Sequence, residues 1–197
     1  MADRLPATIN IGGALPTSLR SSLAEVIAFQ GCRDEFGNGY LTAEEAATLI
    51  EEALRDQKVL MLRDEDASNG MFEELESFLR QNGICYKRTN DAWCEIDCAV
   101  AHFDGNSLVE HLADKSGNVA VTAKRLEQAQ AEGTLEALIA ELRRIEAGVP
   151  PLSDGPNPWQ VQALVAELEA VGRPGHVRQG GVNKEVVRSV VGSGHLC

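Results

Sequence analysis

The sequence predicts an α/β or α+β fold, in which a small mixed sheet of about four strands carries packed helices and is followed by a helical C-terminal part. Short β-branched or apolar runs, such as Ala7–Ile11 and Val59–Leu62, are typical of strands. Amphipathic stretches with apolar residues three and four apart lie between these runs and predict helices. From Asn106 onward only the helical spacing recurs.

The first predicted strand, Ala7–Ile11, ends at two glycines that begin with Gly12. A helix is expected to start at Pro16–Ser18, where a hydroxyl can accept hydrogen bonds from the first free amides, and to stop near Gly31. Its apolar residues recur at helical spacing, but Phe29 fits the stripe less well than the others.

The next helix is predicted from a capping box formed by Thr42 and Glu45. The continuous apolar run Val59–Leu62 then predicts a strand covered on both faces. An acidic turn, Asp64–Gly70, is expected to follow it. A helix over Met71–Arg80 comes next, and its three glutamates are expected to form a solvated acidic face that could meet a basic partner. These glutamates are Glu73, Glu74 and Glu76.

Two more strands complete the predicted sheet, Ile84–Thr89 and Trp93–Phe103. The strand before the Met71–Arg80 helix and the strand after it should run parallel, with a right-handed connection. The short turn at Asn90-Asp91 should make the last pair antiparallel.

The C-terminal part is expected to be helical. The pattern predicts a short helical turn at Leu108–Leu112 and helices over Thr122–Gln130 and Thr134–Glu146. Gly148–Pro158 is rich in proline and glycine and is interpreted as a linker. One more helix is predicted over Trp159–Val171.

These elements suggest a mixed α/β core domain over residues 1–105, a helical extension packed on it over 106–148, and a last part over 149–197 that holds the linker, one helix and a tail. The tail from Gly172 is glycine-rich and basic, in contrast to the acidic body. We expect it to be flexible, or to dock on its own protein or on a neighbouring subunit.

Composition limits the classes of function. The chain has 197 residues and a formal net charge of -12, which disfavours binding to nucleic-acid phosphates and leaves basic proteins as partners. No secretory signal and no apolar run long enough to span a bilayer is visible, so no membrane partner is expected. The odd number of cysteines, 5, favours free thiols in a reducing compartment, and we expect a cytoplasmic protein.

One loop carries a metal-binding pattern. The segment Asp34–Glu45, DEFGNGYLTAEE, resembles the twelve-residue calcium loop of the EF-hand family. The resemblance implies calcium ligands at Asp34, Asn38 and Glu45 and at the carbonyl of Tyr40. The loop departs from the family at its third position, where a phenylalanine replaces an oxygen ligand, and no second loop accompanies it.

A second candidate follows the apolar strand. The segment VLMLRDEDASNG resembles the strand and Asp-x-Asp motif of the Toprim domains, which are metal-dependent nucleic-acid enzymes. The resemblance implies that Asp64 and Asp66 hold Mg²⁺, a cation that prefers such oxygen ligands. The family also requires a glutamate after an earlier strand, where this chain has Gly12. The alternative interpretation is a solvated turn that caps the next helix.

Cys94, Cys98 and His102 are spaced four residues apart but do not predict a metal site. On a strand, with about 3.3 Å per residue, the two thiols stand about 13 Å apart, whereas Zn–S bonds are about 2.3 Å long. We interpret these residues as one buried face of a strand.

The sequence therefore favours a cytoplasmic, non-enzymatic binding or accessory protein that acts through an acidic surface on a protein partner, and that could itself form a homo-oligomer. The alternative is a divalent-metal protein, with calcium at the Asp34–Glu45 loop or magnesium at Asp64 and Asp66 in a nucleic-acid enzyme. The stretch Val59–Asp104 also resembles segments of bacterial proteins, but this resemblance implies no activity.

Overall fold

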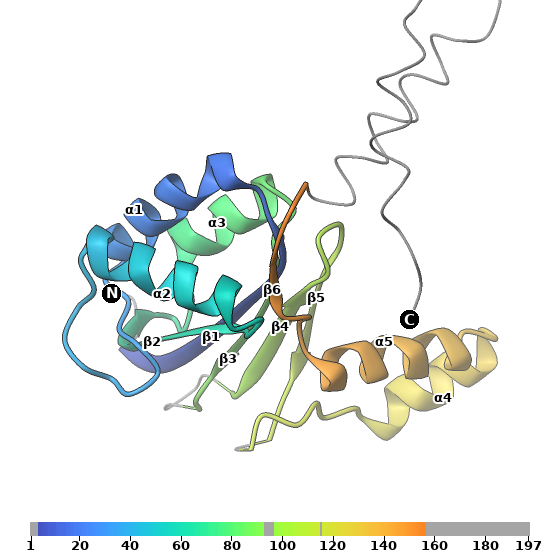
Figure 1. Cartoon of the computed structure of the whole chain (residues 1–197). Helices are drawn as coiled ribbons and strands as arrows, with labels where there is room; N and C mark the ends of the chain where they lie inside the picture. Colours follow the sequence, from blue (N-terminus) through green and yellow to red (C-terminus); the bar gives the residue numbers. More distant parts are fainter. Residues whose placement is uncertain (1–3, 93–96, 115, 157–197) are drawn as a thin grey trace, which may run out of the picture. The chain divides into compact units, whose positions relative to one another are not determined.

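Figure 1 shows a computed structural model of the chain, which describes residues 4–92, 97–114 and 116–156. They belong to one compact unit, Met1–Ala163, and a second unit, Leu164–Cys197, lies outside them. The predicted helix Trp159–Val171 and the tail from Gly172 therefore lie outside the described residues. The elements, in chain order, are β1 (Arg4–Leu15), the 3-10 helix η1 (Thr17–Leu19), α1 (Arg20–Gln30), α2 (Ala43–Arg55), β2 (Leu60–Ser68), α3 (Glu73–Gln81), β3 (Cys85–Asn90), β4 (Ala99–Phe103), β5 (Leu108–Leu112), α4 (Ala123–Ala131), α5 (Leu135–Ala147) and β6 (Leu152–Asp154).

The fold is a mixed α/β arrangement, which confirms the predicted class. Its main sheet has the order β2-β1-β3-β4-β5, and all of these neighbours pair antiparallel. The long strand β1 is an interior strand, which pairs with β2 on one side and with β3 on the other. Its last residues, Gly13–Leu15, pair parallel with β6.

The unit β2-α3-β3 has the expected direction but not the expected adjacency. Both strands run antiparallel to β1, so they run parallel to each other, with β1 inserted between them. The end of β2 also differs from the prediction. It continues through the predicted acidic turn to Ser68, and the turn itself is Asn69-Gly70, whose φ angles of 52° and 68° both lie in the left-handed region.

The later strands correct two predictions. The strand predicted over Trp93–Phe103 begins only at Ala99 and pairs with β3 in the expected antiparallel sense; residues 93–96, with Cys94, lie outside the described residues. The predicted helical turn Leu108–Leu112 is strand β5. A five-residue apolar-polar alternation fits a strand with one exposed face as well as it fits a helical turn, so its length could not separate the two.

Helices cover both faces of the sheet. In Figure 1, α1, α2 and α3 lie on one face, and the core is formed there by apolar residues of β1, β2 and β3 such as Ile9, Ile11 and Leu62. The helix α2 begins with the predicted capping box, in which Thr42 and Glu45 exchange both hydrogen bonds. The helix α1 ends at the predicted glycine, Gly31, with a φ of 76°.

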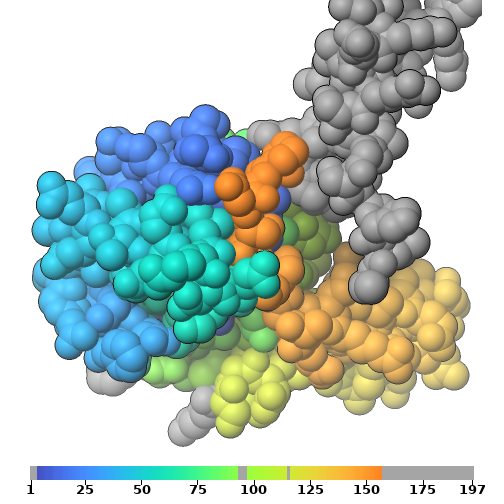
Figure 2. All heavy atoms as spheres, in the orientation of Figure 1, coloured from blue at the N-terminus to red at the C-terminus, as the bar shows by residue number. Residues whose placement is uncertain are grey.

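The segment predicted as a linker is part of the sheet. Within 148–158, residues Leu152–Asp154 form β6, which lies beside β1 and against the N-terminal helices (Figure 2). Arg20 of α1 holds Asp154 by an ion pair of 2.8 Å. The two predicted helices before it are present as α4 and α5. On the sheet face opposite α3, Nζ of Lys87 donates to the carbonyl of Ile145, which attaches α5 to β3.

No described helix is long and apolar enough to cross a membrane.

Candidate interaction surface

The four ligands implied by the EF-hand-like loop line one open hollow. Asp34, Asn38, Tyr40 and Glu45 all border this hollow, which has a volume of about 340 Å³. The structure therefore brings together the residues that the sequence pattern selected. Tyr40 is also held by Arg33, whose guanidinium lies 4.8 Å from the centre of the tyrosine ring.

The two carboxylates among these implied ligands, Asp34 and Glu45, already have hydrogen-bond partners within the chain. Asp34 accepts from the backbone amide of Phe36 and from both nitrogens of Asn38, and the Asn38 side chain is the main reason why the pKa of Asp34 lies below its ordinary value. Glu45 accepts from the amide and the hydroxyl of Thr42, each at 2.9 Å, which lowers its pKa. The acids thus shape the loop and start α2.

The second predicted metal pair lies inside β2, not in a turn after it. Asp64 is buried on the face toward α1–α3, and burial is the main reason why its pKa is raised. Its Oδ1 accepts a hydrogen bond of 2.9 Å from the backbone amide of Asp66, whose own side chain is exposed. The pairing between β1 and β2 shifts register here, between Leu5 and Ala7. The bulge turns the two carboxylates into different environments.

Among the residues that the structure describes, no group of three or more histidine, cysteine, aspartate or glutamate side chains is arranged to hold a metal ion. The calcium site at Asp34–Glu45 and the magnesium site at Asp64 and Asp66 therefore stay predictions.

A second surface contains both exposed apolar side chains and exposed glutamates. It is a groove of about 340 Å³ between α1 and α3, which we call the α1–α3 groove. Its lining residues are Glu25, Val26, Phe29, Glu74, Ser77, Phe78 and Gln81. The two helices lie side by side on the same face of the sheet (Figure 1).

A side-chain cap fixes the two helices relative to each other. The Oε1 atom of Gln30, the last residue of α1, accepts from the backbone amides of Glu74 and Leu75 at 3.2 and 3.5 Å. These amides belong to the first turn of α3 and have no partner within the helix. Gln30 thus caps α3 from a neighbouring helix, and the groove is formed without any ligand.

Phe29 is the most exposed large apolar residue of the described chain. Its side chain is 79% exposed, whereas Val26 and Phe78 beside it are partly buried against the core. Transfer of an exposed aromatic ring from water into an apolar contact is favourable. Aromatic residues are also enriched at protein–protein interfaces. Phe29 is therefore an exposed aromatic residue at the edge of a partly buried apolar surface.

The rim of the groove is acidic. Glu25 comes from α1 and Glu74 from α3, and both are exposed. Glu73, the residue before Glu74, is exposed as well but does not line the groove. The third glutamate of the predicted acidic face does not belong to it. Glu76 is buried at 4% exposure and points from α3 toward the sheet, because it lies within the apolar stripe of the helix, four positions after Phe72 and three before Leu79.

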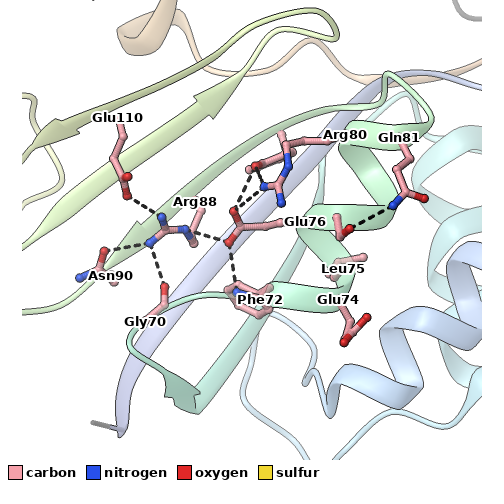
Figure 3. Close-up of polar contacts among 12 residues, drawn as sticks. Gly70, Phe72, Glu74, Leu75, Glu76, Arg80, Gln81, Arg88, Asn90 and Glu110 are labelled. Atoms are coloured by element: carbon pink, nitrogen blue, oxygen red, sulfur yellow. Dashed lines mark hydrogen bonds and ion pairs between the residues drawn. The ribbon is translucent and has the colours of Figure 1, made fainter. Parts of the chain in front are cut away.

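Glu76 belongs instead to a buried polar network behind α3 (Figure 3). Its Oε1 accepts from the amide of Phe72, and its Oε2 accepts from the hydroxyl of Tyr86 and from Arg80. Burial, together with the charge of Glu76, raises the pKa of Tyr86. The network therefore holds the beginning and the middle of α3 on β3.

Arg88 is the cation at the centre of this network. Its Nε lies 2.9 Å from Oε1 of Glu76, an ion pair whose N–H direction falls outside hydrogen-bond geometry. Its two terminal nitrogens donate to the carbonyl of Gly70, to the side chain of Asn90 and to Glu110. Arg88 thereby connects the Asn69-Gly70 turn, β3 and β5 in one set of contacts.

Sequence patterns pointed to only part of this surface. The misfit of Phe29 in the apolar stripe of its helix was the available signal, since a large apolar residue off the stripe has to be exposed. The cap by Gln30 joins residues that are 44 positions apart in the chain, so no local pattern contains it. The same holds for the contacts of Arg88 with Gly70 and Glu110, which are 18 and 22 positions away.

No family model, no curated protein and no solved structure matches this chain.

Proposed function

We propose that this chain is a non-enzymatic binding protein whose α1–α3 groove takes a segment of a partner protein that carries both basic and apolar residues. The observation that carries the proposal is the position of Phe29, 79% exposed in a preformed groove with an acidic rim. The apolar part of the segment would cover Phe29, Val26 and Phe78.

Charge supports the basic character of the segment. Glu25 and Glu74 face the groove, and the whole chain carries a net charge of -12. A field of this sign accelerates the encounter with a cationic partner and repels anionic ones. Charges at the rim contribute mainly to association rate and selectivity, so most of the affinity would come from the aromatic anchor.

A peptide selection tests the proposal without a known partner. A display library of random twelve-residue peptides would be selected on the full chain, and the enriched peptides measured against Phe29→Ser. We expect the peptides to combine lysine or arginine with large apolar residues, and to lose at least about tenfold in affinity, or about 1.4 kcal/mol, on Phe29→Ser. Because Phe29 is exposed, Phe29→Ser should leave the fold intact.

The matched control is Phe36→Ser. Phe36 is 77% exposed, almost as much as Phe29, but it lies in the loop before α2 and does not line the α1–α3 groove. Peptides that bind the wild type and the Phe36→Ser variant equally, but not the Phe29→Ser variant, support the proposal. Peptides that bind Phe29→Ser as well as the wild type would overturn it.

Sedimentation of the wild-type protein and of Phe29→Ser tests whether a second copy of the chain occupies the groove. A wild-type dimer that dissociates in the Phe29→Ser variant would replace the partner segment by a second copy. If the wild type and Phe29→Ser sediment with the same mass, a second copy of the chain does not occupy the groove, and the groove stays available for another protein.

A further inference from the structure

The strand β5 forms one end of the main sheet, and its pairing shows which of its backbone groups face outward. The amide of Ala113 donates to the carbonyl of Cys98, so the backbone of Ala113 faces the β4 side. Because the direction alternates along a strand, the backbone groups of Leu108, Glu110 and Leu112 face away from β4. The carbonyl of Leu112 confirms this direction, since it accepts from Ala120 on the outer side at 2.8 Å.

The outer edge of β5 is open before Leu112. Among residues 4–92, 97–114 and 116–156, none pairs with the outward amide and carbonyl groups of Leu108 and Glu110. The contact from Ala120 closes only the C-terminal end of the strand. An unpaired strand edge is a template on which another extended chain can form hydrogen bonds.

The side chains along this edge alternate in chemistry on one face. Leu108 and Leu112 are 44% and 51% exposed, and Glu110 lies between them on the same face by the period of two. The buried Arg88 holds the side chain of Glu110 in place, because its Nη2 donates a hydrogen bond of 2.7 Å to Oε1 of Glu110 (Figure 3). No described residue hydrogen bonds to its other carboxylate oxygen, and its side chain is 56% exposed.

We propose that the outer edge of β5 binds an extended segment of a partner protein by strand addition, with a lysine or arginine of that segment opposite Glu110 and apolar residues opposite Leu108 and Leu112. Backbone pairing would cover Leu108–Glu110, and Leu112 would contribute through its side chain. Cross-strand pairs of opposite charge and of apolar residues stabilise such pairing, whereas like charges weaken it.

The charges of β5 do not favour pairing with β5 of a second copy of the chain. The strand Leu108–Leu112 contains no lysine or arginine, so no register of β5 against β5 places a cation opposite Glu110. His111 lies on the other face, where its Nε2 is 2.8 Å from Glu141 of α5. The edge therefore fits a different strand, and this proposal does not rest on the α1–α3 groove.

The probe is a capped peptide, Thr-Val-Thr-Arg-Thr-Val-Thr, with Thr-Val-Thr-Glu-Thr-Val-Thr as its charge-reversed control. Titration of the full chain, followed by amide NMR signals, should move the signals of Leu108 and Glu110 with the arginine peptide only. Hydrogen exchange of these two amides should slow by at least about tenfold, because they gain carbonyl partners. Equal binding of both peptides, signal changes only outside β5, or no binding would each overturn the proposal.

Two variants separate strand addition from general attraction of a cation. Glu110→Lys should exchange the preference, so that the glutamate peptide binds and the arginine peptide does not. Leu108→Pro removes an outward amide that β4 does not use and should abolish binding of the arginine peptide while Glu110 is kept. Leu126→Thr, at a residue of α4 that is 40% exposed, is the control that should leave binding unchanged.

The fold of each variant is checked by its amide spectrum. Glu110→Lys places a second cation next to Arg88 and can therefore prevent folding. In that case Leu108→Pro is the test, and peptide binding that survives Leu108→Pro would overturn the proposal. Phe29→Ser should leave this binding intact. A loss of peptide binding on Phe29→Ser would place the peptide in the α1–α3 groove and also overturn the assignment to β5.

Discussion

Arg88 and Glu76 form an ion pair of 2.9 Å between β3 and α3, and both side chains are almost completely buried. Removing two charges from water costs free energy that their attraction repays only when further hydrogen bonds satisfy the remaining atoms. Here Phe72, Tyr86 and Gly70 supply such bonds. The pair is therefore integrated into the fold, and its two members depend on each other.

We predict that Arg88→Met lowers the free energy of unfolding by about 3–5 kcal/mol, because it leaves the buried Glu76 with only the more exposed Arg80 as a cationic partner. Urea denaturation measures the loss. The double variant Arg88→Met/Glu76→Gln should lose less stability than the sum of the two single variants, because it leaves neither charge buried without its partner. The control is Arg144→Met, which breaks the exposed pair with Asp104 and should cost less than about 1 kcal/mol. Equal losses for both arginines would contradict the prediction.

The turn that precedes α3 depends on Gly70. Its φ is 68°, and a Cβ atom there would lie 2.6 Å from Cβ of Asn90 and 2.9 Å from the side chain of Leu5. We predict that Gly70→Ala lowers the free energy of unfolding by about 2 kcal/mol or more, through backbone strain and overlap together. Thermal denaturation followed by circular dichroism measures it.

Gly37→Ala separates the two causes. Gly37 has a φ of 72°, close to that of Gly70, but nothing lies within 4 Å of a Cβ atom there. This variant should therefore show the backbone strain without the overlap and should lose less stability. If both alanine variants lose the same amount, the contact with Asn90 and Leu5 is not the cause.

Local sequence patterns were sufficient where the structure is decided locally. The capping box of Thr42 and Glu45 and the glycine end of α1 at Gly31 follow from neighbouring residues, and both are confirmed. Each involves groups that are at most four positions apart, so the pattern contains the whole interaction.

Patterns were not sufficient where partners are distant in sequence. The strand β2 continues to Ser68 because it pairs with β1 on both sides of the bulge, as far as the pair of Arg4 and Ser68. No local sequence signal indicates this pairing. Charged residues such as Asp64 favour turns by composition, yet pairing with β1 overrides this preference. The α1–α3 groove was missed for the same reason, because its two sides come from helices separated by α2 and β2.

The buried carboxyl of Asp64 predicts a dependence of stability on pH. Burial raises its pKa above the value of 3.8 for a free carboxyl, so the folded state holds the proton more strongly than the unfolded state. The stability that the protonated form contributes is present below that value and is lost as the pH rises through the folded pKa. Asp64→Asn should therefore gain stability relative to the wild type between about pH 3 and about pH 7.

Asp34→Asn provides the contrast of opposite sign. The pKa of Asp34 is lowered, mainly by the side chain of Asn38, so its ionised form stabilises the folded state as the pH rises. This variant should lose stability relative to the wild type over the same interval. Urea denaturation of the three proteins at both pH values measures the differences, and the same sign for both variants would contradict the assignment.

Calcium tests the loop Asp34–Glu45 directly. We expect calcium at about 1 mM to leave the thermal midpoint unchanged, because a bound ion would have to replace the hydrogen bonds that Asp34 and Glu45 make to Asn38 and Thr42. Calorimetric titration should likewise show no binding heat. Heat that is present in the wild type and absent in Asp34→Asn would contradict this expectation and establish the loop as a calcium site. Heat that persists in Asp34→Asn would place the ion elsewhere, and magnesium titration of Asp64→Asn would then test β2.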